Sequence, residues 1–412
     1  MFKENNNKMH LKHIASNQEL GKWPDIQPED IKAILDVLDS GILYSGKGGP
    51  NSDLLEEKWG DYCKVPSPNV VAVSACTAAL HLAMITLGVG PGDEVITTAM
   101  TFSGTSHPIC YTGATPIFVD VNPLTFNLDP ESVRNAISKK TKAILPVHLH
   151  GLMADMPALQ TIAAENNIFL IEDACQAHGA TIRDKKAGTW GDVGCFSLSE
   201  SKSLTGGQGG FIVFRDRTYA DKARMLRNYG EDPSSGERRD YTSYDIGFNY
   251  VLSEIPAALA ISQLNRLDKY NTQANRNAIY LSKLLSKISG LCPPFIPNGY
   301  FHIFHKYRLV FDPTVWFSKA LSPSTSRDII LHYLQSKNVP VTTWQTMPVP
   351  EYPVFRNLES TPCPKAQYIL DHSIIIGDER HPLAVQNKHT MLLWANIIGE
   401  LFDKLSSIYS RK

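Results

Sequence analysis

The sequence predicts an α/β protein of two domains, a large domain built on a mostly parallel sheet and a smaller α+β domain after it. Three observations predict this. A chain of 412 residues exceeds the size of one typical core. Short β-rich runs alternate with helical stretches between residues 68 and 215. After about residue 265 longer helical patterns replace this alternation, so we place the domains at residues 1–265, with an N-terminal arm, and residues 266–412.

Seven short runs of apolar and β-branched residues predict the strands of the large domain. They cover residues 70–74, 94–97, 115–121, 143–147, 168–173, 195–199 and 210–214. Helical patterns at residues 77–87, 130–138 and 156–166 lie between them. Because strands that alternate with helices form parallel sheets, we expect a ligand beyond the carboxyl ends of these strands.

The second domain is predicted from three long helical patterns and one short strand. The helices cover residues 275–288, 324–336 and 388–407, and the strand covers residues 307–311. Prolines at 293, 294 and 297 mark a loop before that strand.

Composition favours small-molecule chemistry in the cytoplasm. Forty basic residues balance forty-one acidic ones, so no basic excess indicates nucleic acid or an anionic membrane as a partner. The polar N-terminus has no apolar core typical of a signal peptide, and no run of about 18 apolar residues predicts a membrane span. The seven cysteines are odd in number and include no C-x-x-C pair, which predicts neither a disulfide framework nor a metal site.

The first chemical motif is Glu172-Asp173-Ala174-Cys175-Gln176, at the end of an apolar predicted strand. A carboxylate there lies at the carboxyl edge of the sheet, where ligands bind. Taken alone, an Asp after a strand is more often a turn or N-cap residue.

The second motif runs from a predicted strand into Lys202 and then into a cluster of glycines, Gly206-Gly207-Gln208-Gly209-Gly210. Four glycines in five residues predict unusual backbone angles or the close approach of a bulky group. A lysine amine beside such a backbone can form an imine with an aldehyde cofactor. The alternative is a solvated lysine on a surface loop.

The third motif is Ser74-Ala75-Cys76-Thr77, at a predicted junction of strand and helix. Backbone N–H groups at a helix N-terminus, together with the Thr77 hydroxyl, form a natural phosphate cradle. A simple N-cap is the alternative here. The order and spacing of the three motifs favour the functional interpretation over the separate alternatives. Asp173 follows Thr77 by 96 residues and precedes Lys202 by 29.

In this combination the chain resembles the DegT/StrS-type family of pyridoxal-phosphate (PLP) dependent sugar aminotransferases, from about Trp23 to the last helix. The motifs that carry the resemblance are I-E-D-A-x-Q-A-H-G and F-S-x-x-x-x-K-x-L-x-x-G-x-G-G. The resemblance implies the fold-type I architecture, with a mostly parallel, seven-stranded mixed sheet in the large domain. It also implies PLP as cofactor and a homodimer with shared active sites.

The resemblance implies a role for each matching residue. Lys202 would carry PLP as a Schiff base and then move the proton, and Asp173 would pair with the protonated pyridine nitrogen, a pairing that lowers a carboxyl pKa. The other implied cofactor contacts are Gln176 at the ring oxygen, Phe102 stacked on the ring, the phosphate contacts Ser74, Ala75, Cys76, Thr77 and Ser197, and Asn249, which would reach the partner subunit's phosphate.

Four positions depart from the family pattern: Cys76 replaces Gly, Ser199 replaces His, Gln208 replaces Glu and Val251 replaces Arg. Ser199 and Val251 weaken a direct transfer of nucleotide-sugar contacts. Local matches at residues 146–151, 153–156 and 363–366 resemble the branch that acts on ketocyclitols such as scyllo-inosose. The predicted reaction moves an amino group from glutamate or glutamine to a ketone of a cyclitol or sugar.

Other functions stay open at this point. A nucleotide-linked 3- or 4-keto sugar is the alternative acceptor. A 2-oxo acid would need its carboxylate held, usually by a bidentate Arg, and the sequence identifies none. Family members that act as dehydratases replace the lysine, so Lys202 argues against that class. A non-catalytic, PLP-binding regulatory protein is the alternative of another class, and an epimerase or lyase could share the same residues.

Overall fold

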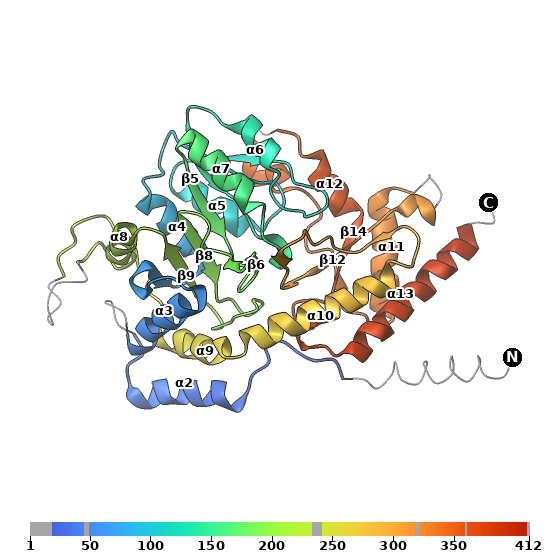
Figure 1. Cartoon of the computed structure of the whole chain (residues 1–412), viewed down its shortest axis with the longest axis horizontal. Helices are drawn as coiled ribbons and strands as arrows, with labels where there is room; N and C mark the ends of the chain where they lie inside the picture. The colour runs from blue at the N-terminus through green and yellow to red at the C-terminus, as the bar shows by residue number, and fades with distance from the viewer. Residues whose placement is uncertain (1–18, 45–48, 233–240, 318–320, 359–360, 410–412) are drawn as a thin grey trace.

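The computed structural model describes residues 19–44, 49–232, 241–317, 321–358 and 361–409. A sheet sandwiched between helices forms the larger part of the molecule, and a second, smaller sheet lies against α10, α11 and α13 (Figure 1). Within the described residues, no helix is both long and apolar enough to cross a membrane.

The large sheet has seven strands in the order β1-β9-β8-β5-β4-β2-β3. Neighbouring strands pair in parallel except β9, which is antiparallel to β8 and β1. The predicted mixed, mostly parallel sheet is therefore confirmed. Its strands are β1 (Val70–Val73), β2 (Glu94–Thr98), β3 (Thr115–Val119), β4 (Thr141–Leu145), β5 (Phe169–Asp173), β8 (Val193–Ser197) and β9 (Gly210–Phe214).

Helices cover both faces of this sheet because successive strand residues point to opposite sides. Val70 and Ala72 join one apolar core, whereas Val71 and Val73 join the other. The first core is closed by α3 (Pro50–Cys63), α6 (Pro130–Ala136), α7 (Met156–Asn166) and α9 (Glu254–Leu264). The second is closed by α4 (Cys76–Thr86), α5 (Ser103–Tyr111) and α8 (Arg217–Arg227).

The second sheet is antiparallel, with the order β10-β12-β14-β13. Its strands are β10 (Leu291–Cys292), β12 (Tyr307–Phe311), β13 (Val341–Thr342) and β14 (Ser373–Ile376). The helices around it are α10 (Leu267–Leu285), α11 (Pro323–Ser336), α12 (Pro364–Asp371) and α13 (Lys388–Tyr409). This α+β arrangement has an apolar core of its own.

Smaller elements connect the two sheets. Strand β11 (Tyr300–Phe301) pairs with β6 (Thr181–Ile182), which pairs with β7 (Lys185–Lys186). Helix α2 (Pro28–Ser40) lies against α9 at the edge of the molecule (Figure 1). The remaining elements are single turns: η1 (Ser67–Asn69), η2 (Leu149–Gly151), η3 (Pro313–Val315), η4 (Val349–Glu351), η5 (Pro353–Phe355) and η6 (Leu383–Val385).

A domain boundary at residue 265 remains our proposal. In its support, the core of the second sheet contains buried residues from Ala274 to Leu405 and none from the large sheet. Leu20 of the N-terminal arm packs against this second core. The arm therefore contacts the small domain although it precedes the large one in sequence.

Candidate active site

Strand β5 ends in two carboxylates with different environments. Glu172 is fully buried, and its oxygens accept hydrogen bonds from His148 Nε2 and from the backbone N–H groups of Gly188, Trp190 and Gly191 at 2.6–2.8 Å. The next residue points to the other side of the strand, so Asp173 lines a cavity of about 190 Å³. Glu172 thus holds a loop in place, while Asp173 faces a space that a ligand can enter.

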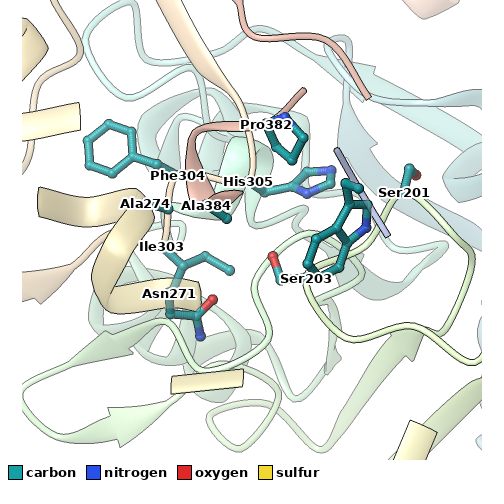
Figure 2. A pocket seen from close by; sticks show the side chains of 10 residues that line it. Ser201, Ser203, Asn271, Ala274, Ile303, Phe304, His305, Pro382 and Ala384 are labelled. Carbon is teal, nitrogen blue, oxygen red and sulfur yellow. The ribbon is translucent and has the colours of Figure 1, made fainter. Parts of the chain in front are cut away.

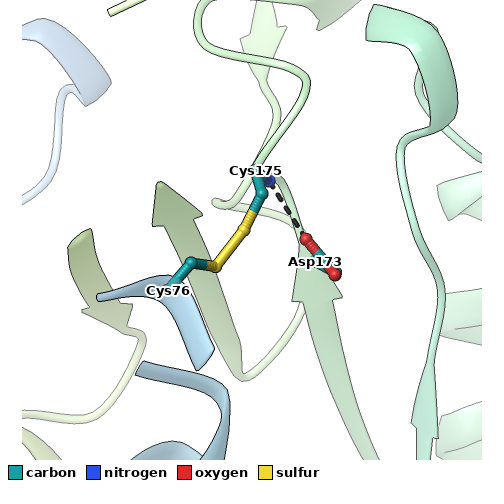
Figure 3. A group of neighbouring side chains, drawn as sticks. All are labelled: Cys76, Asp173 and Cys175. Atoms are coloured by element: carbon teal, nitrogen blue, oxygen red, sulfur yellow. Dashed lines mark hydrogen bonds between the residues drawn. A yellow bond between two sulfur atoms is a disulfide. The ribbon is translucent and has the colours of Figure 1, made fainter. Parts of the chain in front are cut away.

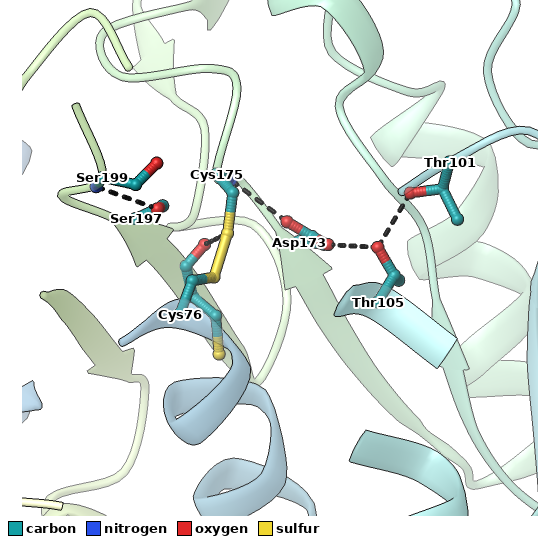
Figure 4. The surroundings of a disulfide bond; sticks show 8 residues. Cys76, Thr101, Thr105, Asp173, Cys175, Ser197 and Ser199 are labelled. Atoms are coloured by element: carbon teal, nitrogen blue, oxygen red, sulfur yellow. Dashed lines mark hydrogen bonds between the residues drawn. A yellow bond between two sulfur atoms is a disulfide. The ribbon is translucent and has the colours of Figure 1, made fainter. Parts of the chain in front are cut away.

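Asp173 is held by two donors. Thr105 Oγ1 donates to Oδ2 at 2.7 Å, and the Cys175 N–H donates to Oδ1 at 3.1 Å (Figure 4). Thr101 Oγ1 lies 2.8 Å from Thr105 Oγ1 and extends this chain of hydroxyls. Burial raises the pKa of Asp173, and the bonds from Thr105 and Cys175 and the charge of Lys202 oppose that rise. Among the protein's own groups, burial outweighs those that favour the charged form, and the lowered pKa expected of Asp173 beside the pyridine nitrogen of PLP stays a prediction.

Removal of the Thr105 hydroxyl is expected to act through Asp173. In Thr105→Val the side chain keeps its shape, but the carboxylate loses a donor that lowers its pKa. The acid limb of the pH–rate profile should move to higher pH, and kcat/KM should fall about tenfold or more, the usual effect of losing a bond to a charged group. Thr105→Ser keeps the hydroxyl and serves as the control. Identical pH profiles for the Val and Ser variants would contradict the link to Asp173.

Helix α4 begins at the cavity without a cap. Its N-cap residue is Ala75, which has no side-chain acceptor, and the described residues supply no other cap to the first turn. The first hydrogen bond along the helix backbone joins the Ala79 N–H to the Ala75 carbonyl. The N–H groups of Cys76, Thr77 and Ala78 precede the first intrahelical bond, and Cys76 and Thr77 line the cavity. This start of the helix can accept an anion such as a phosphate.

The glycine cluster has both properties that its sequence predicts. Gly207 and Gly209 adopt φ values of +82° and +139°, a region that favours glycine. At Gly210, a Cβ atom would lie 2.9 Å from the Ala75 carbonyl carbon and 3.0 Å from the Cys76 nitrogen. Strand β9 therefore passes directly against the start of α4, and the glycines make this approach possible.

Lys202 lies in a tight turn between β8 and the glycine cluster, where its N–H donates to the Ser199 carbonyl at 3.0 Å. The turn is anchored by Trp23, whose Nε1 donates to the Glu200 carbonyl at 2.7 Å. Ser201 and Ser203, on either side of Lys202, line a small cavity together with Asn271, Ile303 and His305 (Figure 2).

The Lys202 amine lines the same cavity as Asp173. Burial lowers the pKa of Lys202, and the negative charges of Asp173 and Glu379 oppose this change. A lower pKa leaves a larger share of the amine neutral and nucleophilic at neutral pH.

Eight of the ten predicted site residues line this cavity: Ala75, Cys76, Thr77, Phe102, Asp173, Gln176, Ser197 and Lys202. Phe102 is 65% exposed. Its ring lies against Gly104, where an added Cβ atom would lie 2.9 Å from a ring carbon. Gln176 is buried, and its Oε1 accepts the His150 N–H at 2.8 Å. Ser197 Oγ accepts the Ser199 N–H at 3.2 Å.

The other two predicted residues lie outside the lining. Ser74 donates its N–H to the Tyr250 carbonyl at 2.8 Å. Asn249 is exposed and forms an isolated β-bridge with Asn228.

Five residues line the cavity although the sequence interpretation does not single them out: Leu80, Thr101, Gly104, Thr105 and Cys175. Thr101 precedes α5 and Thr105 lies in its first turn, so no periodic pattern in the sequence relates their hydroxyls.

One expectation about the cysteines is wrong. Cys76 and Cys175 form a disulfide, although the sequence predicts no such bond (Figures 3 and 4). The two residues are 99 positions apart, but their Cα atoms lie 6.9 Å from each other because the start of α4 meets the end of β5. Their sulfur atoms and an Asp173 oxygen lie within 4.8 Å of one another. Because the two sulfurs are bonded to each other, they are not thiolate ligands, and within this group only the Asp173 carboxylate could bind a metal.

The site thus combines three groups at one sheet edge: an amine with a lowered pKa, a buried carboxylate and an uncapped helix start. Comparison with known proteins extends this description. Residues 24–379 match the model of the DegT/DnrJ/EryC1/StrS aminotransferase family.

The chain is similar to GDP-perosamine synthase of Caulobacter vibrioides, with 37% identity over 69% of this chain and 73% of the relative. It is also similar to a putative L-glutamine:3-amino-2,3-dideoxy-scyllo-inosose aminotransferase of Streptomyces kanamyceticus, with 35% identity over 73% and 71%. The solved structure of the aminotransferase TlmJ from Streptoalloteichus hindustanus superposes with a TM-score of 0.82 at 26% identity and covers 95% of this chain and all of its own. The chain belongs to the DegT/DnrJ/EryC1/StrS aminotransferase family of PLP-dependent enzymes.

Proposed function

We propose that the protein transfers an amino group from glutamate or glutamine to a ketone of a cyclitol or sugar in the cytoplasm. The observation that carries this proposal is the convergence of Lys202, Asp173 and the start of α4 on one cavity. Each of these groups supplies what one part of PLP requires.

The residues present fit PLP at this cavity. The uncapped first turn of α4, with Thr77 and Ser197, would hold the phosphate, and the close approach of Gly210 keeps this cradle narrow. Asp173 would keep the proton on the pyridine nitrogen, since a cation beside it offsets the penalty of its burial. When bound, PLP supplies an electron sink for the bond that breaks at the donor carbon. The Lys202 Nζ would hold the cofactor covalently and, once released, move the proton.

The acceptor is proposed from the residues around this centre. Ser199 lines the cavity with a short side chain where related sequences have His, which leaves room beside Lys202. Val251 is buried and bridges Val73, so it offers no charge to a nucleotide phosphate. Both observations favour an uncharged ketocyclitol such as a scyllo-inosose. A nucleotide-linked 3- or 4-keto sugar is the second candidate, favoured by the similarity to GDP-perosamine synthase.

A homodimer is part of the proposal. Asn249 would complete the phosphate site of a second copy, and the chain segment before it exposes apolar side chains, among them Ile246 at 86%. Helix α2 exposes a further stripe at Ile31, Leu35 and Leu38, each about half exposed. Large exposed apolar areas indicate an interface, and an obligate dimer buries over about 2,000 Å².

Ile246→Asp is expected to shift the protein from dimer to monomer, because a charge in an apolar interface must be desolvated without a partner. Sedimentation measures the change, and the monomer should retain less PLP because each phosphate site would lose the other subunit's Asn249. Val354→Asp changes another exposed apolar side chain, 66% exposed and in the small domain, and serves as the control. A fully active wild-type monomer would rule out the shared site.

The proposed function is tested in two steps. First, the PLP form is mixed with a panel of amino acids, and the cofactor absorbance reports the half-reaction; glutamate or glutamine should convert it. Second, the converted protein is offered scyllo-inosose or a nucleotide-linked 4-keto sugar, and mass spectrometry identifies the aminated product. Lys202→Ala is the matched control, since it keeps the cavity but not the amine.

The same experiment separates the enzyme from a regulatory protein. PLP binding with no conversion by any amino acid would support the non-catalytic alternative and contradict ours. If an amino acid converts the cofactor but neither acceptor is aminated, the assignment as an aminotransferase stands and the proposed acceptor class is rejected.

A further inference from the structure

The Cys76–Cys175 disulfide joins the two segments that PLP would contact at its opposite ends. Cys76 is the first residue of α4, whose uncapped first turn would hold the phosphate. Cys175 follows Asp173 by two positions, and its N–H donates to Asp173 Oδ1 at 3.1 Å. Both cysteines are half-buried and line the PLP cavity, so the disulfide lies inside the proposed site (Figure 3).

The bonded sulfurs lie close to the carboxylate that the ring nitrogen would approach. Both sulfur atoms are within 4.8 Å of an Asp173 oxygen. A Cβ atom on Gly210 would lie 3.0 Å from the Cys76 nitrogen, so β9 prevents the start of α4 from moving away on that side. At the other end, Asp173 pairs with Cys195 of β8 and accepts the Thr105 hydroxyl at 2.7 Å. Because both ends are held, neither can withdraw to make room for a ring beside the sulfurs.

The position of this pair sets it apart from the other cysteines. The remaining five are free thiols away from the PLP cavity, three of them buried and two exposed: Cys63, Cys195, Cys363, Cys110 and Cys292. Cys76 is also one of the four departures from the family pattern. The chemistry proposed for this site uses an amine, a carboxylate and a helix start, and it gives no role to two sulfur atoms.

We propose that Cys76 and Cys175 form a reversible redox switch, in which the disulfide weakens PLP binding and the two free thiols permit it. The proposal rests on the PLP cavity of the proposed function and not on the identity of the acceptor. In the oxidised protein, the bonded sulfurs and the pyridine ring compete for the space beside Asp173. Disulfides in a reducing cytoplasm are usually transient and catalytic or redox-sensing, so the dithiol is the form that takes up the cofactor there.

The switch operates by thiol–disulfide exchange with a small-molecule thiol. The thiolate of that molecule attacks the Cys175 sulfur, the S–S bond breaks, and Cys76 leaves as a thiolate that takes up a proton. The N–H groups of the first turn of α4 favour negative charge on Cys76, which makes it the better leaving group. A second small thiol then attacks the mixed disulfide, releases Cys175 and departs as a small disulfide. The two cysteines gain two electrons and two protons from the two thiols, and the small disulfide is the oxidant of the reverse reaction.

Peptide mapping and a PLP titration of the full-length protein test the switch. PLP-free protein is equilibrated with reduced or with oxidised glutathione, and mass spectrometry of one portion identifies the cross-linked peptides. We expect the Cys76–Cys175 cross-link in the oxidised sample and PLP binding at least tenfold weaker than in the reduced one, measured by cofactor absorbance. No cross-link, or equal affinity in both samples, would overturn the switch and leave the PLP site in place. No PLP binding in either sample would reject the site and the switch together.

Thermodynamic linkage supplies a measurement that does not depend on activity. If the disulfide weakens PLP binding, PLP must oppose disulfide formation by the same factor. In a series of glutathione redox buffers, saturating PLP should therefore move the midpoint of disulfide formation to more oxidising potentials. The expected shift is about 30 mV for each tenfold difference in affinity. A midpoint that is the same with and without PLP would refute the competition.

Single substitutions assign the response to this pair. Cys175→Ser removes one partner of the bond, so its PLP affinity should be the same in both glutathione buffers. Cys76→Ser is the second variant, in case the first does not fold, and should behave in the same way. Cys110→Ser removes an exposed free thiol of α5 and is the control that should keep the full response. A response that persists in the two cavity variants, or that disappears in Cys110→Ser, would contradict the assignment.

Discussion

Lys202→Ala is expected to abolish transamination while the protein stays folded. The amine lines the cavity beside Asp173, and burial lowers its pKa, which favours the neutral form that attacks an aldehyde. The loss of proton transfer alone should reduce the half-reaction rate by on the order of 10²–10⁴. The turn itself is held by backbone bonds and by Trp23, not by the lysine side chain, so the melting temperature should change little.

Borohydride reduction followed by peptide mapping provides the second measurement for Lys202. The wild-type protein should carry the reduced cofactor on the peptide that contains Lys202, and the alanine variant should carry none. Lys202→Arg keeps a positive charge without an amine that can be linked, and it separates the covalent role from a purely electrostatic one. Cofactor fixed to a different lysine would show that the assignment is wrong.

Asp173→Asn is expected to have the second-largest effect. It should slow transamination on the order of 10²–10³, the usual cost of removing a preorganised electrostatic partner. In the proposed site the carboxylate would hold the proton on the ring nitrogen, and the resulting positive charge would favour loss of the donor's proton. The amide keeps the size of the side chain but not its charge, so PLP should still bind.

The local bonds of Asp173 explain why Asp173→Asn should stay folded. The amide oxygen can accept the Cys175 N–H, and the Thr105 hydroxyl can turn to accept from the new NH₂ group, since Thr101 and Thr105 exchange a bond in either direction. Asp173→Glu should be milder where the longer carboxylate reaches the ring. If Asp173 were only a turn or cap residue, Asp173→Asn would lose about 1 kcal/mol of stability and keep near-normal turnover. Half-reaction rate and melting temperature, measured together, decide between the two.

The large sheet could be predicted because its strands are buried on both faces. Continuous apolar runs such as residues 70–73 mark them, and all seven are predicted to within two residues of their observed ends. Helix α5 could not be predicted, since Gly104 and Pro108 are weak helix formers and its stability comes from packing against α4. Strand β14 has only four residues, a serine and three isoleucines, too few to show a period, and its identity comes from pairing with β12.

The site was predictable where local motifs meet the ends of strands. Lys202, Asp173 and Thr77 belong to motifs at the carboxyl edge of a parallel sheet, and the order of these motifs, with the family resemblance, singles the residues out. Groups brought together by long-range packing could not be predicted. Thr105 reaches Asp173 across 68 positions, and Arg308 reaches His150 across 158. No periodic pattern encodes such contacts.

The adjacent carboxylates at the end of β5 make cofactor retention a measure of correct folding. A slip of β5 by one position along β8 would turn Glu172 toward the PLP cavity and Asp173 toward the loop at residues 188–191, because side chains alternate along a strand. Such a molecule would lose three bonds to this loop, the bond from His148 to Glu172 and the proposed partner of the ring nitrogen at once. Bound PLP should colour the protein yellow, so the colour of a preparation should report the fraction of chains whose β5 paired in native register. An expression screen can select for correctly folded protein by this colour without any substrate.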